Sequence, residues 1–140
     1  MKESENVDGE DETYVKIDAD SKKTNGWKTL KEMKEYLRSE FEKKTTTLER
    51  NEGQTYLHFA AYLGDVDAIK ILLIEDNAEL KAGDEEKKAA LHWAAEKGHV
   101  DVAKVLIQNG ADVNAVTENK WTALLQAARN GYVDVAKMLI

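Results

Sequence analysis

The sequence predicts an all-α solenoid of stacked two-helix units, because three of its segments repeat one residue pattern at a nearly fixed spacing. The segments are residues 55–67, 89–101 and 122–134. Their corresponding leucines, Leu57, Leu91 and Leu124, follow one another after 34 and 33 residues. A period of this size is typical of stacked copies of one supersecondary unit. A stack exposes a long ridged surface, which favours binding over catalysis.

The first 23 residues are polar and acidic, and we expect them to form a disordered tail. Eight of them are Asp or Glu and four are Lys. Such a composition cannot bury enough apolar surface to offset the entropy lost on ordering. The alternation Tyr-Val-Lys-Ile at residues 14–17 leaves open the alternative of a short strand that pairs with a partner.

Residues 24–48 are expected to form an N-terminal capping helix. Apolar side chains recur there at steps of three and four residues, which places them on one stripe of an amphipathic helix. They are Trp27, Leu30, Met33, Tyr36, Leu37 and Phe41. Thr24 and Asn25 are the candidate caps at its start. A stack needs an end element with one apolar and one polar face; a helix that binds a partner is the alternative.

Each repeated unit reads as a polar loop, a short inner helix, a glycine and an outer helix. In the second unit Leu91, Ala94 and Ala95 share one face of the inner helix. The glycine follows the inner helix directly, where a left-handed residue is needed and another residue costs about 1–2 kcal/mol. The three glycines are Gly64, Gly98 and Gly131.

The period, the Leu-His-x-Ala-Ala block and the run Gly-Ala-Asp-Val-Asn-Ala at residues 110–115 resemble ankyrin repeats. The resemblance covers residues 49–140 and divides them into units 49–82, 83–115 and 116–140, the last of them truncated. It implies helix–turn–helix units with projecting hairpin loops, stacked with slight curvature. The loop tips and the inner helices then form the concave side.

Several positions depart from the family pattern. The Pro that starts the family's inner helices is absent, and its places are held by Tyr56, Ala90 and Ala123. The loop glycine Gly53 becomes Lys87 and Lys120 in the later units, and Leu125 stands where the family has His. The last outer helix reaches Ile140 without a polar cap. We therefore expect a truncated fragment that is marginally stable, or that self-associates through this uncapped C-terminal end.

Two pairs of equivalent residues are expected to be structural. His58 and His92 should each accept or donate a hydrogen bond at the start of an inner helix, with Thr55 as a hydroxyl partner for the first. Phe59 and Trp93 take the following slot and should face the core. The histidines are too few and too dispersed for a zinc site, which needs three or four convergent ligands.

Composition excludes several other classes of function. The chain has no cysteine and a formal charge of −7, which speaks against thiol chemistry, nucleic-acid binding and docking on anionic membranes. The carboxylates of residues 84–86 are expected to be solvated in a loop. We expect no catalytic residue, cofactor, metal or small-molecule substrate. The cytosol is the expected compartment, or a host cytosol if the protein is bacterial and secreted.

The resemblance assigns partner-binding residues to the concave side by register. They are Gln54, Tyr62, Leu63, Glu85, Glu86, Lys88, Glu96, Lys97, Glu118, Asn119, Trp121, Arg129 and Asn130. Trp121 and Tyr62 are the expected anchors, since Trp and Tyr are enriched at interfaces, although packing of Trp121 on the neighbouring loop is the alternative. The expected function is binding of another protein. The alternative is a targeting or regulatory fragment of a larger enzyme or secreted effector.

Overall fold

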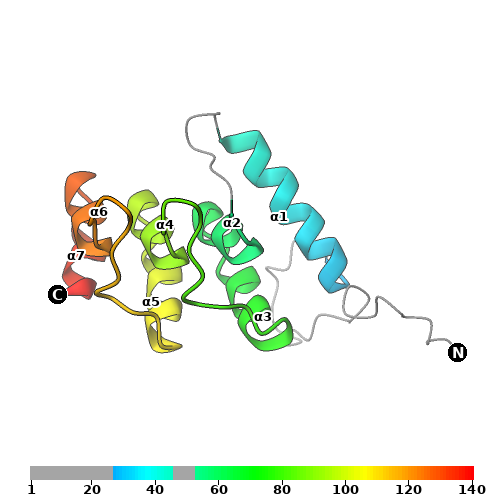
Figure 1. Ribbon diagram of the computed structural model, residues 1–140. Helices are drawn as coiled ribbons and strands as arrows, with labels where there is room; N and C mark the ends of the chain where they lie inside the picture. The colour runs from blue at the N-terminus through cyan, green and yellow to red at the C-terminus, as the bar shows by residue number, and fades with distance from the viewer. Residues whose placement is uncertain (1–26, 46–52) are drawn as a thin grey trace, which may run out of the picture.

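The computed structural model describes residues 27–45 and 53–140, so the expected disordered tail lies outside the described residues. The described residues contain seven helices in a stack, which confirms the all-α repeat fold (Figure 1). They are α1 (Leu30–Lys44), α2 (Tyr56–Leu63), α3 (Val66–Glu75), α4 (Ala90–Lys97), α5 (Val100–Gln108), α6 (Ala123–Arg129) and α7 (Val133–Leu139). The expected unit boundaries remain predictions.

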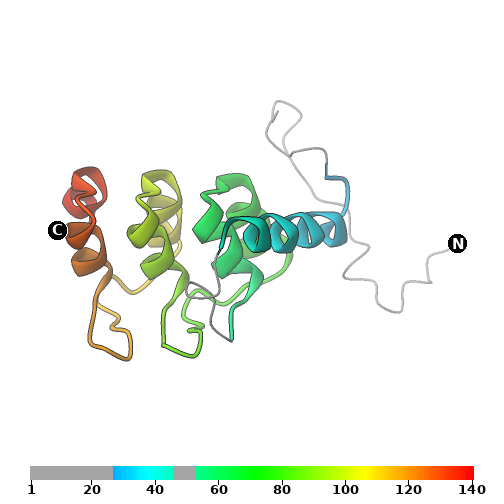
Figure 2. The ribbon, with the colours of Figure 1, turned by 90° about the horizontal axis from the view of Figure 1, so that it is seen from above.

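The helices form two rows and an end element. Inner helices α2, α4 and α6 lie in one row, and outer helices α3, α5 and α7 lie in the other. Leu57, Leu91 and Leu124 each occupy the second position of an inner helix, as the repeat requires. The loops between units project together to one side, and α1 crosses the end of the stack beside α2 (Figure 2).

The start of α1 differs from the expected one. Thr29, and neither Thr24 nor Asn25, is the N-cap, because its side chain accepts a hydrogen bond from Glu32 N. The carboxylate of Glu32 in turn accepts from the backbone N–H of Lys28 at 2.7 Å. These two hydrogen bonds satisfy backbone N–H donors that have no partner within the first turn of the helix. The cap expected at residues 24 and 25 is therefore wrong.

The apolar stripe of α1 packs on the first unit. Leu30, Met33, Leu37 and Phe41 are its buried residues. Trp27 precedes the helix, yet its ring is buried against Tyr36, with 5.5 Å between the ring centroids. Burying each large side chain of this stripe contributes about 1.5–3 kcal/mol. The stripe therefore fixes α1 as the end element of the stack.

The glycine that follows each inner helix allows the next layer to approach. Gly64 and Gly98 have φ of 77° and 76°, in the left-handed region. A Cβ on Gly64 would lie 2.7 Å from the His99 ring, and one on Gly98 would lie 2.7 Å from the Tyr132 ring. Gly131 has the same φ but meets nothing within 4 Å. At Gly64 and Gly98, therefore, a ring of the following unit lies directly over the glycine.

Two buried histidines join successive units. The His58 ring accepts at Nδ1 from Thr55 N (2.9 Å) and donates from Nε2 to the carbonyl of Lys88 (2.8 Å). His92 repeats this arrangement with Ala89 N and the carbonyl of Ala115, both at 3.0 Å. Because Nδ1 accepts, the network assigns the proton to Nε2. Each ring thus ties an inner helix to the next hairpin loop.

Acid should destabilise the stack, because burial lowers the pKa of His58, His92 and His99 below 6.5. The unfolded chain then takes up protons at a higher pH than the folded chain does. The neutral histidines contribute fully to the free energy of unfolding above the pKa that they have in the unfolded chain. This contribution is lost as the pH falls below that pKa. We expect the urea midpoint to fall between about pH 7.5 and about pH 5.5. An unchanged midpoint across this window would contradict the assignment of neutral, bridging rings.

Gly98→Ala should destabilise the protein more than Gly131→Ala does. Both changes place a Cβ at φ of 76°, which costs about 1 kcal/mol. Only the first also forces the Tyr132 ring to move. Urea titration would measure both free energies of unfolding, and equal losses would show that the ring contact is unimportant.

Candidate functional site

One hollow on the inner side of the second and third units gathers six of the residues that the sequence nominated. Its volume is about 150 Å³, and Thr117 and Gln126 complete its lining. The six are Glu86, Lys88, Glu96, Asn119, Trp121 and Arg129. We call these eight residues the inner-face site. They come from α4, α6 and the two hairpin loops that precede these helices.

The ammonium group of Lys88, in the second unit, has two partners. Lys88 Nζ lies 3.0 Å from Glu96 Oε1 and 4.7 Å from the centroid of the Trp93 ring. The ion pair is partly exposed, so it adds little stability. Its effect is positional, because the ring and the carboxylate together fix where the ammonium group lies.

Trp121 lies half-buried at the start of the third unit. The guanidinium carbon of Arg129 is 5.6 Å from the centroid of its ring. Its backbone N–H donates to Thr117 Oγ1 at 3.2 Å, and its carbonyl accepts from Thr117 N at 2.9 Å. The loop therefore sets the position of the indole, and the arginine lies over one of its faces.

The two hairpin loops of the site are connected to each other. The backbone N–H of Glu118 donates to the carbonyl of Glu86 at 2.8 Å. Glu85 and Glu118 themselves are exposed at these loops. The bond sets the spacing between the second-unit and third-unit parts of the site.

Asp84 corrects the expectation of a solvated loop carboxylate, since it is buried. One oxygen accepts from the N–H groups of Glu86 (3.0 Å) and Lys88 (2.9 Å). The other accepts from Trp93 Nε1 at 3.2 Å. Asp accepts from the backbone a few residues onward in many turns, and this local preference is the signal that could have identified it.

Gln126 is a second residue that sequence reasoning missed. It occupies the slot that Phe59 and Trp93 fill in the first two units, and it is buried. An amide is smaller than an indole and brings a donor and an acceptor. The repeat itself contained this signal, because only the third unit has a polar residue in that slot. The substitution makes the hollow of the third unit polar.

Tyr62 is not the exposed anchor that the register suggested. The residue is only 8% exposed, and its ring packs against Phe41 and Trp93, with centroid distances of 5.0 and 5.5 Å. Its hydroxyl donates to the carbonyl of Lys44 at 3.2 Å. The ammonium group of Lys97 lies 4.7 Å from the centroid of the ring. The expected exposure of Tyr62 is wrong, because Phe41 and Lys44 of α1 cover it; its role in binding a partner stays a prediction.

Three other nominated residues lie apart from the hollow. Asn130 is exposed, and its side-chain amide donates to the carbonyls of Glu96 and Gln126. Gln54 is half-buried, and its Nε2 is buried without a hydrogen-bond partner among the described residues. Leu63 lines a different cleft.

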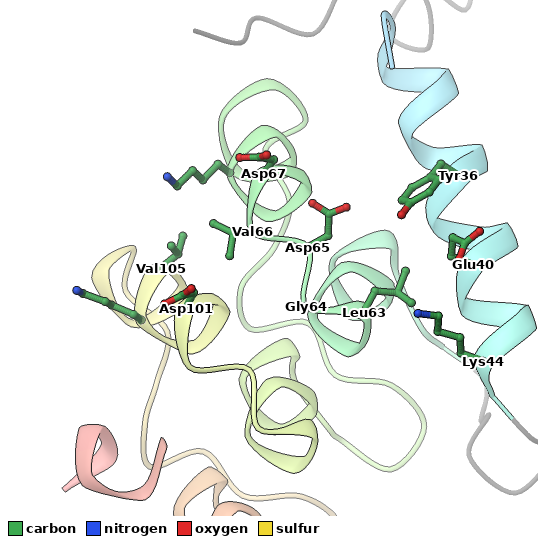
Figure 3. Close-up of a pocket in the computed structure, with 12 residues that line it drawn as sticks. Tyr36, Glu40, Lys44, Leu63, Gly64, Asp65, Val66, Asp67, Asp101 and Val105 are labelled. Atoms are coloured by element: carbon green, nitrogen blue, oxygen red, sulfur yellow. The ribbon is translucent and has the colours of Figure 1, made fainter. Parts of the chain in front are cut away.

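That second cleft, of about 740 Å³, separates α1 from the starts of α3 and α5 (Figure 3). The carboxylate of Asp65 points toward Tyr36 across it. Asp65 caps α3 by accepting from Ala68 N at 3.1 Å. Burial raises the pKa of Asp65, and burial together with the Asp65 charge raises the pKa of Tyr36. Both carboxylates and lysines line the cleft, so it shows no strong preference for one sign of charge.

Within residues 27–45 and 53–140, no group of three or more His, Asp or Glu residues could hold a metal ion. None of the described helices combines the length and the apolar character needed to cross a bilayer.

Comparison with known proteins agrees with this geometry. A family model described as ankyrin repeats, in three copies, matches residues 23–117 and 57–140. The chain belongs to the ankyrin-repeat family. The matched ranges together include the end helix α1 and all three ankyrin units.

Individual relatives share part of the repeat region. The chain is 41% identical over 59 residues to the mitochondrial liver isoform of glutaminase from Rattus norvegicus, covering 42% of this chain and 10% of that protein. It is 46% identical over 58 residues to palmitoyltransferase AKR1 of Candida glabrata, covering 41% and 8%. It is 43% identical over 60 residues to neurogenic locus notch homolog protein 1 of Homo sapiens, covering 43% and 2%. The chain therefore spans a tenth or less of these relatives.

Asp84→Ala should destabilise the second ankyrin unit. The change removes three hydrogen bonds and leaves the buried indole N–H of Trp93 without its partner, at a cost of about 1–3 kcal/mol. Asp112→Ala is the matched control, since exposed Asp112 accepts one bond from Asn114 N. Urea titration of both variants tests this, and similar small losses would contradict the role given to Asp84.

Proposed function

We propose that this ankyrin chain binds another protein through the inner-face site of its second and third units. The observation that carries the proposal is that residues from two hairpins and two inner helices converge on one open, polar hollow. Ankyrin repeats are a general protein-interaction module, and their common use is consistent with this surface.

The side chains of the site favour a partner segment that is polar and that also makes an apolar contact with the site. Arg129 and Lys88 offer cationic donors, and Glu86 and Glu96 offer carboxylate acceptors. Charges arranged in this way select partner and register more than they add affinity. The indole of Trp121 supplies the large half-buried surface typical of an interface anchor.

The inner face of the first unit contributes less to binding in this proposal. Phe41 packs against Phe59, Tyr62 and Trp93, with centroid distances of 4.6, 5.0 and 6.2 Å. Helix α1 therefore covers the concave surface at the first unit. A partner that extends along the inner face in this direction would contact α1. Contacts with the outward-facing side of α1 are compatible with this arrangement.

Trp121→Ala and Arg129→Glu test the proposal. Photo-crosslinking in lysate of the source cells identifies the partner. Measurement with the purified partner should then show that each variant loses at least about tenfold in affinity. Lys70→Glu is the control, since Lys70 is exposed on outer helix α3. Circular dichroism would confirm folding of all three. Equal affinity of the wild type and the site variants for the partner would contradict the proposal.

A second candidate function has support from the relatives. Glutaminase and palmitoyltransferase are enzymes by name, and the matched segment is a small part of each. We propose as the alternative that this ankyrin segment targets or regulates a larger enzyme or secreted effector. The genomic reading frame around the segment decides between the two, because a catalytic domain encoded in it favours the alternative.

A further inference from the structure

The third unit lacks the pair of buried side chains that the second unit has behind its inner face. In the second unit Trp93 is buried, and its Nε1 donates to the buried carboxylate of Asp84 at 3.2 Å. The equivalent residues of the third unit are Gln126 and Thr117. Neither of them brings a ring or a negative charge, and both line the hollow of the inner-face site.

The side chains of Gln126 and Thr117 have hydrogen-bonding capacity that the described residues do not use. Gln126 is 7% exposed, and none of the described groups forms a hydrogen bond with its side-chain amide. Thr117 is 6% exposed, and its hydroxyl accepts from Trp121 N at 3.2 Å, while its proton has no acceptor in the same part of the chain. Buried polar groups normally have a hydrogen-bond partner. These two groups therefore indicate that a polar group of a ligand enters the hollow.

Arg129 is a cation of the hollow that has no carboxylate partner among the described residues. Its guanidinium carbon lies 5.6 Å from the centroid of the Trp121 ring. The equivalent residues of the second unit are Glu96 and Lys88, which compensate each other as an ion pair at 3.0 Å. The third unit thus has an arginine placed over a ring where the second unit has an ion pair. A guanidinium group can bind a carboxylate through two parallel hydrogen bonds.

The unused groups of the hollow favour a negatively charged ligand group. They are the guanidinium of Arg129, the amide of Gln126 and the hydroxyl of Thr117, and each of them can donate a hydrogen bond to a carboxylate. Glu86 also lines the hollow, but it is exposed to water and none of the described side chains fixes its carboxylate there. The hollow of about 150 Å³ equals the liquid volume of about five water molecules, which is enough for one carboxylate-bearing side chain.

We propose that the partner segment places an aspartate or glutamate side chain in this hollow. The inference rests on the proposed function, since it names the chemistry of the segment that binds at the inner-face site. The partner's carboxylate accepts hydrogen bonds from Arg129 and Gln126. It thereby takes the part that Asp84 has in the second unit, where a carboxylate accepts three hydrogen bonds. Because the whole chain has a formal charge of −7, this attraction acts at short range and does not steer association over a distance.

Selection from a display library of random short peptides tests the proposal with a defined probe. Peptides that bind the full chain but not its Trp121→Ala variant are kept, so that only binders of the inner-face site are counted. We expect these peptides to share an Asp or Glu at one position. Replacing that residue by Asn or Gln in the synthetic peptide should weaken binding to the wild type about tenfold or more. Isothermal titration calorimetry would measure both affinities.

Arg129→Gln separates the carboxylate contact from the other contacts of the peptide. On this variant the same peptide replacement should change the affinity less than about twofold, because the carboxylate has lost its guanidinium partner. Arg38→Gln is the matched control, since Arg38 also lies over a ring, 5.7 Å from the centroid of Tyr56, but is exposed on α1 outside the hollow. It should leave the difference between the two peptides as it is in the wild type. Circular dichroism checks the folding of both variants.

The outcomes distinguish this inference from the proposed function. Peptides that need Trp121 but share no acidic residue would overturn the inference and leave the proposed function standing. A shared acidic residue whose replacement weakens binding equally on the wild type and on Arg129→Gln would overturn it as well. If no selected peptide needs Trp121, the inference and the proposed function are both contradicted.

Discussion

No unit of this protein can bury its own apolar side, and the rest of the structure follows from that constraint. Each two-helix layer is completed by the next one. The ring of His99 lies over Gly64 and hydrogen-bonds to the carbonyl of Tyr62 at 2.9 Å, and Tyr132 lies over Gly98. His58 and His92 each reach a carbonyl on the following hairpin. The contacts between layers therefore also set the positions of the loops.

This coupling explains why the inner-face site has a defined shape although much of it comes from loops. The carbonyl of Lys88 is held by His58, and its N–H is held by Asp84. The neighbouring carbonyl of Glu86 accepts from Glu118 in the next loop. Loop residues tied in this way lose less conformational entropy when a partner binds, which favours affinity. Their side chains project from a fixed backbone.

The end helix changes what the inner face can do. Phe41 inserts among aromatic residues of the first and second units and covers Tyr62. Lys97 and Lys88 lie over the Tyr62 and Trp93 rings of this cluster, and farther along the stack Arg129 lies over Trp121. Such contacts are worth about 0.5–1 kcal/mol each at exposed sites. The inner face thus has an apolar half occupied by the chain itself and a polar half that stays open.

The sequence by itself determined the layers, because their signals are local and repeated. The spacing of Leu57, Leu91 and Leu124 placed the inner helices, and the glycine after each helix placed the turns. The same register marks Gln126 as the one polar residue in the slot of Phe59 and Trp93. The tertiary structure alone decided that Tyr62 is covered and that Asp84 is buried. It also decided which nominated residues share one hollow. Those outcomes depend on how α1 crosses α2 and how one loop meets the next, and such contacts between distant segments leave no periodic pattern in the chain.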